Sequence, residues 1–168
     1  MGRFTSLPVT GSIRNWDTDP SGPNLLEWDR LMSDSDAIDH LRFTQDLIRL
    51  RANQPALRGD KVNPFYCSDR DRVLAFHRWL EGIGHNVIVV ASFAESTWWS
   101  YDLGFPIPGF WKEVFNSDVY DNWVNPIVAG NGDGVFAGGP AMHGMPTSAE
   151  AVLPANGLLV FAHQRASA

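Results

Sequence analysis

The chain has 168 residues, of which 44% are hydrophobic and 19% charged, which fits one globular domain with an extension and excludes a disordered chain. The net charge is -6 and the only lysines are Lys61 and Lys112, so nucleic acid and anionic membranes are not expected as partners. No apolar run could span a bilayer, no signal peptide is visible, and Cys67 is the single cysteine, which together predict a cytoplasmic protein.

The first 32 residues are predicted to be irregular, because prolines and glycines interrupt any long element. These residues are Pro8, Gly11, Pro20, Gly22 and Pro23. Large apolar side chains such as Trp16, Leu25 and Trp28 lie among and just after them. The segment is therefore expected to lie across another surface.

A helix is predicted next, from about Asp34 to Asn53. Ser33 and Asp36 have the spacing of a capping box, and Pro55 disfavours helical geometry at the residue before it. The apolar side chains form two stripes on nearly opposite sides of the helix. One stripe is Ile38, Leu41, Ile48 and Ala52, and the other is Phe43, Leu47 and Leu50. An ordinary surface helix has one such stripe, so this helix is expected to pack between two neighbours.

The chain from Tyr66 onward reads as all-β, and its predicted centre is a hairpin of Val73–Trp79 and Val87–Phe93. Both runs are rich in β-branched and aromatic residues, and glycines punctuate the link between them. The second run is apolar on both alternating faces, which indicates a strand covered on both sides. One cover is expected to be a second sheet that includes Leu158–His163. The other is expected to be the helix with the N-terminal segment or, in a longer enzyme, a barrel.

Four further strands are predicted, at Ser96–Leu103, Trp111–Phe115, Glu150–Leu153 and Leu158–His163. The last two are expected to form a hairpin, because the turn signal Asn156-Gly157 lies between them. Residues 120–139 are expected to form a loop. The pattern predicts a mainly β protein, an antiparallel β-sandwich preceded by an irregular segment and one α-helix.

No motif for catalysis, for a cofactor or for a metal is visible. The five histidines are not spaced as metal ligands, and Cys67 has no histidine signature beside it. The glycine-rich run 130–139 lacks the Lys-Ser/Thr of a phosphate loop, and nothing in the sequence pairs two carboxylates. We therefore predict no catalytic residue, no cofactor and no metal site.

Aromatic residues crowd one part of the chain, namely Trp98, Trp99, Tyr101, Trp111 and Trp123. Aromatic rings stack on sugars, but they also fill cores and interfaces, and packing is the better account of most of them. Trp98, Trp99, Tyr101 and Trp111 stay as candidates for carbohydrate stacking. Trp98 and Trp99 are adjacent, so a strand would direct them to opposite faces.

Four segments together resemble the C-terminal all-β domain of α-amylase superfamily enzymes, and 1,4-α-glucan (glycogen) branching enzymes in particular. They are DRVLAFHRW (Asp71–Trp79), VIVVASF (Val87–Phe93), YDLGFPIPGFWKEVFNSD (Tyr101–Asp118) and LPANGLLVFA (Leu153–Ala162). In addition, LRFTQDLIRLRANQPALRG (Leu41–Gly59) is similar to the last helix of the catalytic (β/α)₈ barrel of these enzymes. The resemblance implies that residues 1–59 are the tail of a barrel and that residues 60–168 are a β-sandwich domain.

The resemblance also implies an activity of the parent enzyme, the transfer of α-1,4-glucan segments to α-1,6 branches in glycogen biosynthesis, without a cofactor. The retaining mechanism of the family uses carboxylates at the ends of barrel strands. A barrel needs roughly 250 residues, and nothing in this chain matches the motifs that carry those carboxylates. The chain is thus expected to be non-catalytic alone, to brace the barrel and to contact α-glucan.

Residues 119–139 depart from the loop that the resemblance implies, so contacts of that loop are not carried over. Two alternatives remain open at this point. The chain could be a free-standing carbohydrate-binding module that uses Trp98 and Trp99 as its platform. It could instead be a structural domain that forms a homodimer through an exposed apolar face.

Overall fold

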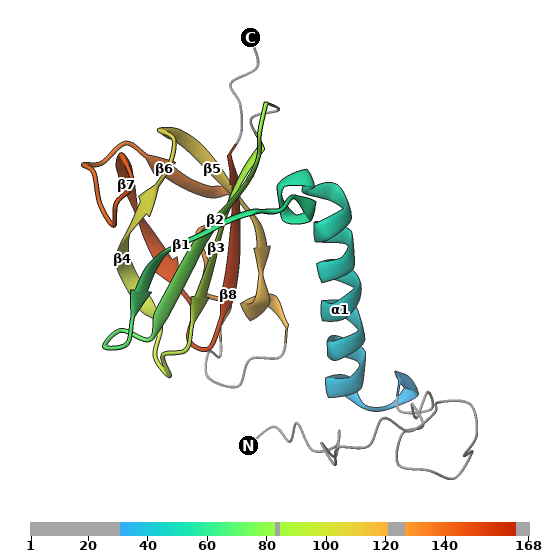
Figure 1. The fold of residues 1–168 in the computed structure, drawn as a ribbon. Coiled ribbons are helices and arrows are strands. Elements are labelled where there is room, and N and C mark those ends of the chain that lie inside the picture. The colour runs from blue at the N-terminus through green and yellow to red at the C-terminus, as the bar shows by residue number, and fades with distance from the viewer. Residues whose placement is uncertain (1–30, 83–84, 121–126, 164–168) are drawn as a thin grey trace, which may run out of the picture.

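The structure, a computed structural model, describes residues 31–82, 85–120 and 127–163. Within these ranges a helix, α1 (Ser35–Asn53), precedes eight strands (Figure 1). The strands are β1 (Lys61–Ser68), β2 (Val73–Leu80), β3 (His85–Ser92), β4 (Trp98–Phe105), β5 (Gly109–Asn116), β6 (Gly134–Ala137), β7 (Thr147–Leu153) and β8 (Leu158–His163). Two short 3-10 helices, η2 (Pro55–Arg58) and η3 (Ser117–Val119), lie in the connections.

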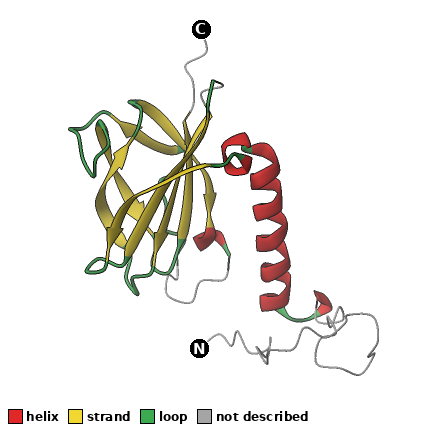
Figure 2. Ribbon diagram, viewed as in Figure 1, coloured by secondary structure: helices red, strands yellow, loops and turns green. Residues whose placement is uncertain are grey.

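The strands form an antiparallel β-sandwich, which confirms the predicted fold class (Figure 2). One sheet has six strands in the order β1-β2-β3-β8-β5-β6, and the other consists of β4 and β7. In Figure 1 the helix α1 stands beside the larger sheet, and the β4–β7 pair lies on the other side of the sandwich. The large sheet therefore has two apolar faces, whereas the small one has a core face and an open face.

The predicted central hairpin is confirmed. β2 and β3 pair in register from Val73 opposite Ser92 to Leu80 opposite His85. β3 then pairs with β8 on its other side, so it lies inside the sheet. Ile88 and Val90 belong to the core between the sheets, and Val87 and Val89 belong to a second cluster on the α1 side. Both faces of β3 are covered because both alternating sets of its side chains are apolar.

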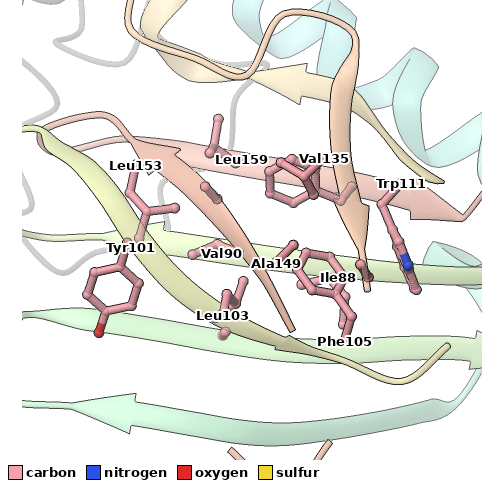
Figure 3. Packing of buried hydrophobic residues seen from close by; sticks show 14 of the residues in the cluster. Ile88, Val90, Tyr101, Leu103, Phe105, Trp111, Val135, Ala149, Leu153 and Leu159 are labelled. Atoms are coloured by element: carbon pink, nitrogen blue, oxygen red, sulfur yellow. The ribbon is translucent and has the colours of Figure 1, made fainter. Parts of the chain in front are cut away.

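The core between the sheets contains the largest buried side chains of the described residues (Figure 3). Leu103 and Phe105 enter it from β4, while Trp111 and Phe161 enter it from β5 and β8. The rings of Phe105 and Trp111 have centroids 5.1 Å apart, a tilted arrangement that aromatic pairs prefer to face-to-face stacking. This core joins the two sheets.

The two lateral edges of the sandwich are joined in different ways. At one edge the amides of Gly138 and Gly139, just after β6, both donate to the carbonyl of Ser148 on β7. At the other edge, β1 and β4 are connected through side chains. The hydroxyls of Tyr66 on β1 and Tyr101 on β4 are 2.6 Å apart, and the Tyr101 hydroxyl also donates to Asp71.

The helix begins one residue later than the predicted cap. Asp34, rather than Ser33, is the N-cap, and its carboxylate accepts hydrogen bonds from the amides of Asp36 and Ala37. An aspartate at this position also places a negative charge at the positive end of the helix dipole. The helix ends at Asn53, before Pro55, as predicted.

The predicted hairpin of β7 and β8 is wrong, because the two strands belong to different sheets. β7 pairs with β4, and β8 lies between β3 and β5. The turn between them does carry Asn156 in the left-handed region, at φ 48°. However, the amide of Asn156 donates to Ala94, and the carbonyl of Gly157 accepts from Ser92. The turn is thus fixed to the end of β3 and carries the chain from one sheet to the other.

The position of β8 also corrects the expected cover of β3. Leu158–His163 lies beside β3 in the same sheet, and the facing sheet consists of β4 and β7. Two strands were not anticipated at their observed extent: β1 begins at Lys61, ahead of the expected start at Tyr66, and β6 lies within the expected loop 120–139.

Candidate functional site

The two adjacent tryptophans at the start of β4 face in opposite directions, as predicted. Trp98 is partly buried, packs against the core and meets Tyr101 edge to face, with centroids 5.6 Å apart. Its indole N–H is buried and has no hydrogen-bond partner among the described residues. Trp99 is 69% exposed. Of the two, only Trp99 presents its ring to solvent.

The other two stacking candidates, Tyr101 and Trp111, belong to the core. The Trp111 side chain has no exposed surface, and its indole N–H donates to the carbonyl of Ile107 at 3.0 Å. Tyr101 is buried, and burial together with the hydrogen bond to Tyr66 raises the pKa of its hydroxyl. Neither ring has a face available for a sugar. Trp123, part of the same predicted aromatic region, lies outside the described residues.

Polar side chains surround Trp99 on the outer face of the β4–β7 pair. Ser100 and Asp102 are exposed on β4, and Asp102 lies directly opposite Glu150 of β7. The Ser100 hydroxyl donates to the carboxylate of Glu150 at 2.6 Å. This face thus offers an aromatic ring and several hydrogen-bond acceptors.

His143 lies in the loop before β7 and borders the edge where β1 meets β4. Its ring stacks on Tyr66, with centroids 3.8 Å apart, and its Nδ1 accepts from the amide of Gly104 at 3.4 Å. Burial lowers the pKa of His143, and the charge of Asp102 partly opposes this effect. The loop around it, 141–146, lines an open hollow. Nothing in the spacing of the sequence indicated that Tyr66 and His143 would meet.

Only one of the two apolar stripes of α1 packs on the sandwich. Phe43, Leu47 and Leu50 pack on the cluster formed by the outer face of the large sheet. The opposite stripe faces away, where Ile38 is 44% and Ile48 is 65% exposed. No residue of α1 is fully buried. Among the described residues, the expected packing between two neighbours is therefore realised on one side of the helix.

Tyr120, just after η3, anchors α1 to the sandwich. Its hydroxyl donates to Asp46 at 2.7 Å, and its ring meets Phe43 at 5.3 Å in an edge-to-face contact. Burial and the bond to Asp46 raise the pKa of Tyr120 to about 12. The same hydrogen bond is the main cause that lowers the pKa of Asp46. The guanidinium of Arg42 lies 5.3 Å from the centre of the tyrosine ring, on the same side of the helix.

A polar network fixes residues 129–131 beside β5 and β7. The carboxylate of Glu113 accepts from the side chains of Asn116 and Asn131, and from the backbone amide of Asn131. Asn131 in turn forms two hydrogen bonds with the backbone of Val152 on β7. Asp118, which is buried, accepts from the amide of Ala129. These side chains satisfy backbone groups that no strand pairs, and sequence spacing gave no signal for them.

Acidification is expected to weaken the fold through His77. This side chain is 9% exposed, stacks on Trp79 and has its Nε2 2.8 Å from Oδ1 of Asn86. Burial lowers its pKa, and the bond to Asn86 only partly opposes that effect. A histidine with a lowered folded pKa contributes stability above its unfolded pKa of about 6.5, and loses that contribution as the pH falls through the folded value.

Urea midpoints from pH 7.5 down to pH 5 should therefore decrease, and His77→Gln should decrease less steeply over the same range. An NMR titration of the His77 ring provides the direct control. An NMR titration midpoint for His77 above about pH 6.5 would contradict this prediction.

The architecture defines a β-sandwich domain preceded by a helix that packs on one sheet. Comparison with known families is consistent with this class, because the family described as Alpha amylase, C-terminal all-beta domain, matches residues 66–164. The chain belongs to this family. None of the helices in the described ranges is long and apolar enough to cross a membrane.

Curated branching enzymes are similar to this chain over a longer range than the family model matches. A 1,4-alpha-glucan branching enzyme of Synechococcus sp. (strain JA-2-3B'a(2-13)) is 31% identical over 145 residues, covering 83% of this chain and 18% of that enzyme. The corresponding enzyme of Pseudomonas fluorescens (strain Pf0-1) is 33% identical over 155 residues, covering 89% of this chain and 20% of the enzyme. The chain thus spans about a fifth of the length of these relatives.

A solved structure extends the comparison to the fold. The alpha-amylase from H. orenii superposes on 88% of this chain with a TM-score of 0.53 and 15% sequence identity, and the chain covers 25% of that structure. At this level of identity the likeness concerns the fold alone. The resemblance to α-amylase superfamily enzymes and to branching enzymes, stated from the sequence, is confirmed by these comparisons.

Proposed function

We propose that this chain is the non-catalytic C-terminal part of a glucan branching enzyme of the α-amylase superfamily, and that it braces the catalytic barrel. The outward-facing stripe of α1, called the exposed stripe, is the observation that carries the proposal: Ile38, Ile48 and Ala52 are exposed in it, and Leu41 is half-buried. A helix that is apolar on two opposite sides and packs on one of them has a second surface to bury. On this proposal residues 1–59 belong to the barrel and residues 60–168 form the sandwich domain.

The barrel is the partner that best fits this surface. The chain spans about a fifth of the two curated relatives named above, and both of these relatives are branching enzymes. In this arrangement α1 is shared: Phe43, Leu47 and Leu50 hold the sandwich, and the exposed stripe contacts the barrel. The sandwich then fixes the last helix of the barrel by burying its outer side. A cytoplasmic location stays a prediction from the sequence.

The first test asks whether the isolated chain branches glucan. The chain is incubated with amylose, and the spectrum of the iodine complex is followed. We expect no change, because the chain lacks the carboxylate motifs of the family. A shift of the spectrum that depends on the chain would refute the non-catalytic role.

The second test asks whether the exposed stripe supports a barrel. This chain replaces the matched region of the Pseudomonas fluorescens relative, and branching by the chimera is measured. Ile48→Asp should reduce the active fraction or lower the melting temperature of the chimera, because it places a charge in an apolar contact. Val62→Asp is the matched control, since Val62 is 52% exposed on β1 and lies outside the stripe. Equal behaviour of the two variants would count against the bracing role.

Self-association through the same stripe is the second candidate function, favoured by the exposure of Ile38 and Ile48. Sedimentation of the isolated chain separates the two cases. A homodimer that dissociates in Ile48→Asp would support it, whereas a monomer at all concentrations would exclude it.

A further inference from the structure

We propose that the open face of the β4–β7 pair binds a segment of α-1,4-linked glucan, with the ring of Trp99 as its platform. This surface, called the Trp99 face below, consists of Trp99, Ser100, Asp102, Glu150 and Val152. The ligand class rests on the proposed function, because it assumes that the parent enzyme acts on glucan. The location and the chemistry of the surface come from the structure.

A β-bulge turns Trp99 outward. Trp98 pairs with Leu153 and Tyr101 pairs with Ala151, so two residues of β4, Trp99 and Ser100, oppose the single residue Val152. An extra residue in one strand changes the alternation and re-aims the side chains beside it. As a result Trp98 faces the core while Trp99 and Ser100 both face solvent. The bulge therefore places an exposed indole and a hydroxyl side by side.

Most of the surface of the Trp99 indole is left out of the packing of the described residues. Tryptophan is the largest side chain and stabilises a fold mainly when it is buried, yet Trp99 remains 69% exposed. Large aromatic side chains that remain on a surface beside polar groups are characteristic of binding sites. A flat ring beside hydrogen-bonding groups matches the two surfaces of a pyranose, its apolar face and its hydroxyl rim.

The polar members of the Trp99 face are suited to a neutral ligand rich in hydroxyls. Asp102 and Glu150 lie directly opposite each other, an arrangement of like charges that destabilises a strand pair. Ionised carboxylates only accept hydrogen bonds, and sugar hydroxyls donate them. The same charges disfavour phosphorylated or acidic ligands, in line with the net charge of -6. A neutral glucan satisfies both requirements.

The Trp99 face lies away from the surface proposed for the barrel. α1 packs on the outer face of the large sheet, and β4 and β7 form the opposite layer of the sandwich (Figure 1). A glucan bound at Trp99 would not compete with the barrel for α1. The site would hold a chain of the polymer on the sandwich domain, and it would raise the local concentration of glucan chains around the parent enzyme.

Affinity electrophoresis of the whole 168-residue chain in native gels containing glycogen tests this proposal. We expect the mobility to fall with glycogen concentration, and Trp99→Ala to weaken the apparent affinity by about tenfold or more. Trp99→Phe should retain part of the retardation, because it keeps an aromatic ring. Glu150→Gln should weaken binding to a smaller extent, since the amide keeps one acceptor oxygen.

Phe136→Ala is the matched control. Phe136 is 71% exposed on β6, but its neighbours Val135 and Ala137 face the core, so its ring points away from the β4–β7 layer. This variant should be retarded like the unmodified chain. Melting curves of all variants ensure that a loss of binding is not a loss of folding, and Trp99→Ala is expected to fold because its side chain is largely exposed.

Three outcomes would overturn the proposal: no retardation of the unmodified chain, equal retardation of Trp99→Ala, or retardation by a β-linked glucan but not by glycogen. The Ile48→Asp variant separates this proposal from the bracing role. It should bind glycogen normally, because Ile48 lies on the exposed side of α1. If the chimera lacks branching activity while the chain still binds glycogen, only the bracing role is refuted. If the chimera is active but the chain does not bind glycogen, only the proposal for the Trp99 face is refuted.

Discussion

Replacing Trp111 with alanine is expected to lower the free energy of unfolding by about 3–5 kcal/mol. The side chain has no exposed surface, and its ring contacts Phe105 and His163, each with a centroid separation of 5.1 Å. Alanine would remove these contacts, leave a cavity between the sheets and leave the carbonyl of Ile107 without its indole donor. Since domains of this size are stable by about 5–15 kcal/mol, such a loss would leave little folded protein at elevated temperature.

Urea unfolding followed by circular dichroism measures this effect, with Trp99→Ala as the control. The control removes the same side chain from an exposed position, so we expect a change within about 0.5 kcal/mol. Trp111→Phe should fall between the two, because it keeps a ring in the core and loses only part of the volume. Equal destabilisation by Trp111→Ala and Trp99→Ala would show that the assignment of core and surface is incorrect.

Replacing Gly134 with alanine is expected to cost about 2–4 kcal/mol and to detach β6 from the sheet. Gly134 has φ +144° and lies opposite Lys112 at the start of β6. A Cβ atom there would collide with the carbonyl oxygen of Trp111 and would lie 2.8 Å from Cα of Lys112. Both obstacles are backbone atoms of the neighbouring strand, so no side chain can move aside to make room.

Gly132→Ala in the same turn is the control that separates the cost of a positive φ from the cost of the collision with β5. Gly132 also has a positive φ, +60°, but nothing lies within 4 Å of its added Cβ. The left-handed conformation alone should cost about 1–2 kcal/mol. Hydrogen exchange would show the difference at the amides of β6, which should lose protection in Gly134→Ala and keep it in Gly132→Ala. If both variants behave alike, the collision with β5 does not determine the stability of this strand pair.

Local sequence patterns correctly predicted those strands whose own alternation of side chains shows which faces must be buried. The β2–β3 hairpin is one case, because residues 87–90 are apolar on both faces and require cover on both sides. The partner of a strand is a different question. Asn156 and Gly157 signal a tight turn, yet the carbonyl of Ala94 and the amide of Ser92 bind this turn and direct β8 into the other sheet. Those partners are about sixty residues away, and no local pattern contains them.

The candidate site could be predicted only in part for a similar reason. Trp99 and Trp111 are both tryptophans in strands, and sequence alone does not tell which one faces solvent. The bulge between Trp98 and Tyr101 decides this for Trp99, and bulges have no strong sequence signal. The packing of Tyr66 against His143 depends on how the two sheets meet. The similarity to branching enzymes indicated the family, whereas the exposed surfaces had to come from the structure.

The unequal edges of the sandwich also bear on how the chain avoids aggregation. Among the described strands β1 pairs through its backbone with β2 alone, and on its other side the hydroxyl and the ring of Tyr66 contact Tyr101 of β4. Such a strand could template the growth of a sheet between molecules. Pro64 offers no N–H to an incoming strand, and the register shift between Pro64 and Tyr66 interrupts the regular row of donors and acceptors. The β1 edge, which is not sealed by backbone pairing with the other sheet, therefore offers a strand of another molecule no continuous row of hydrogen-bond donors and acceptors.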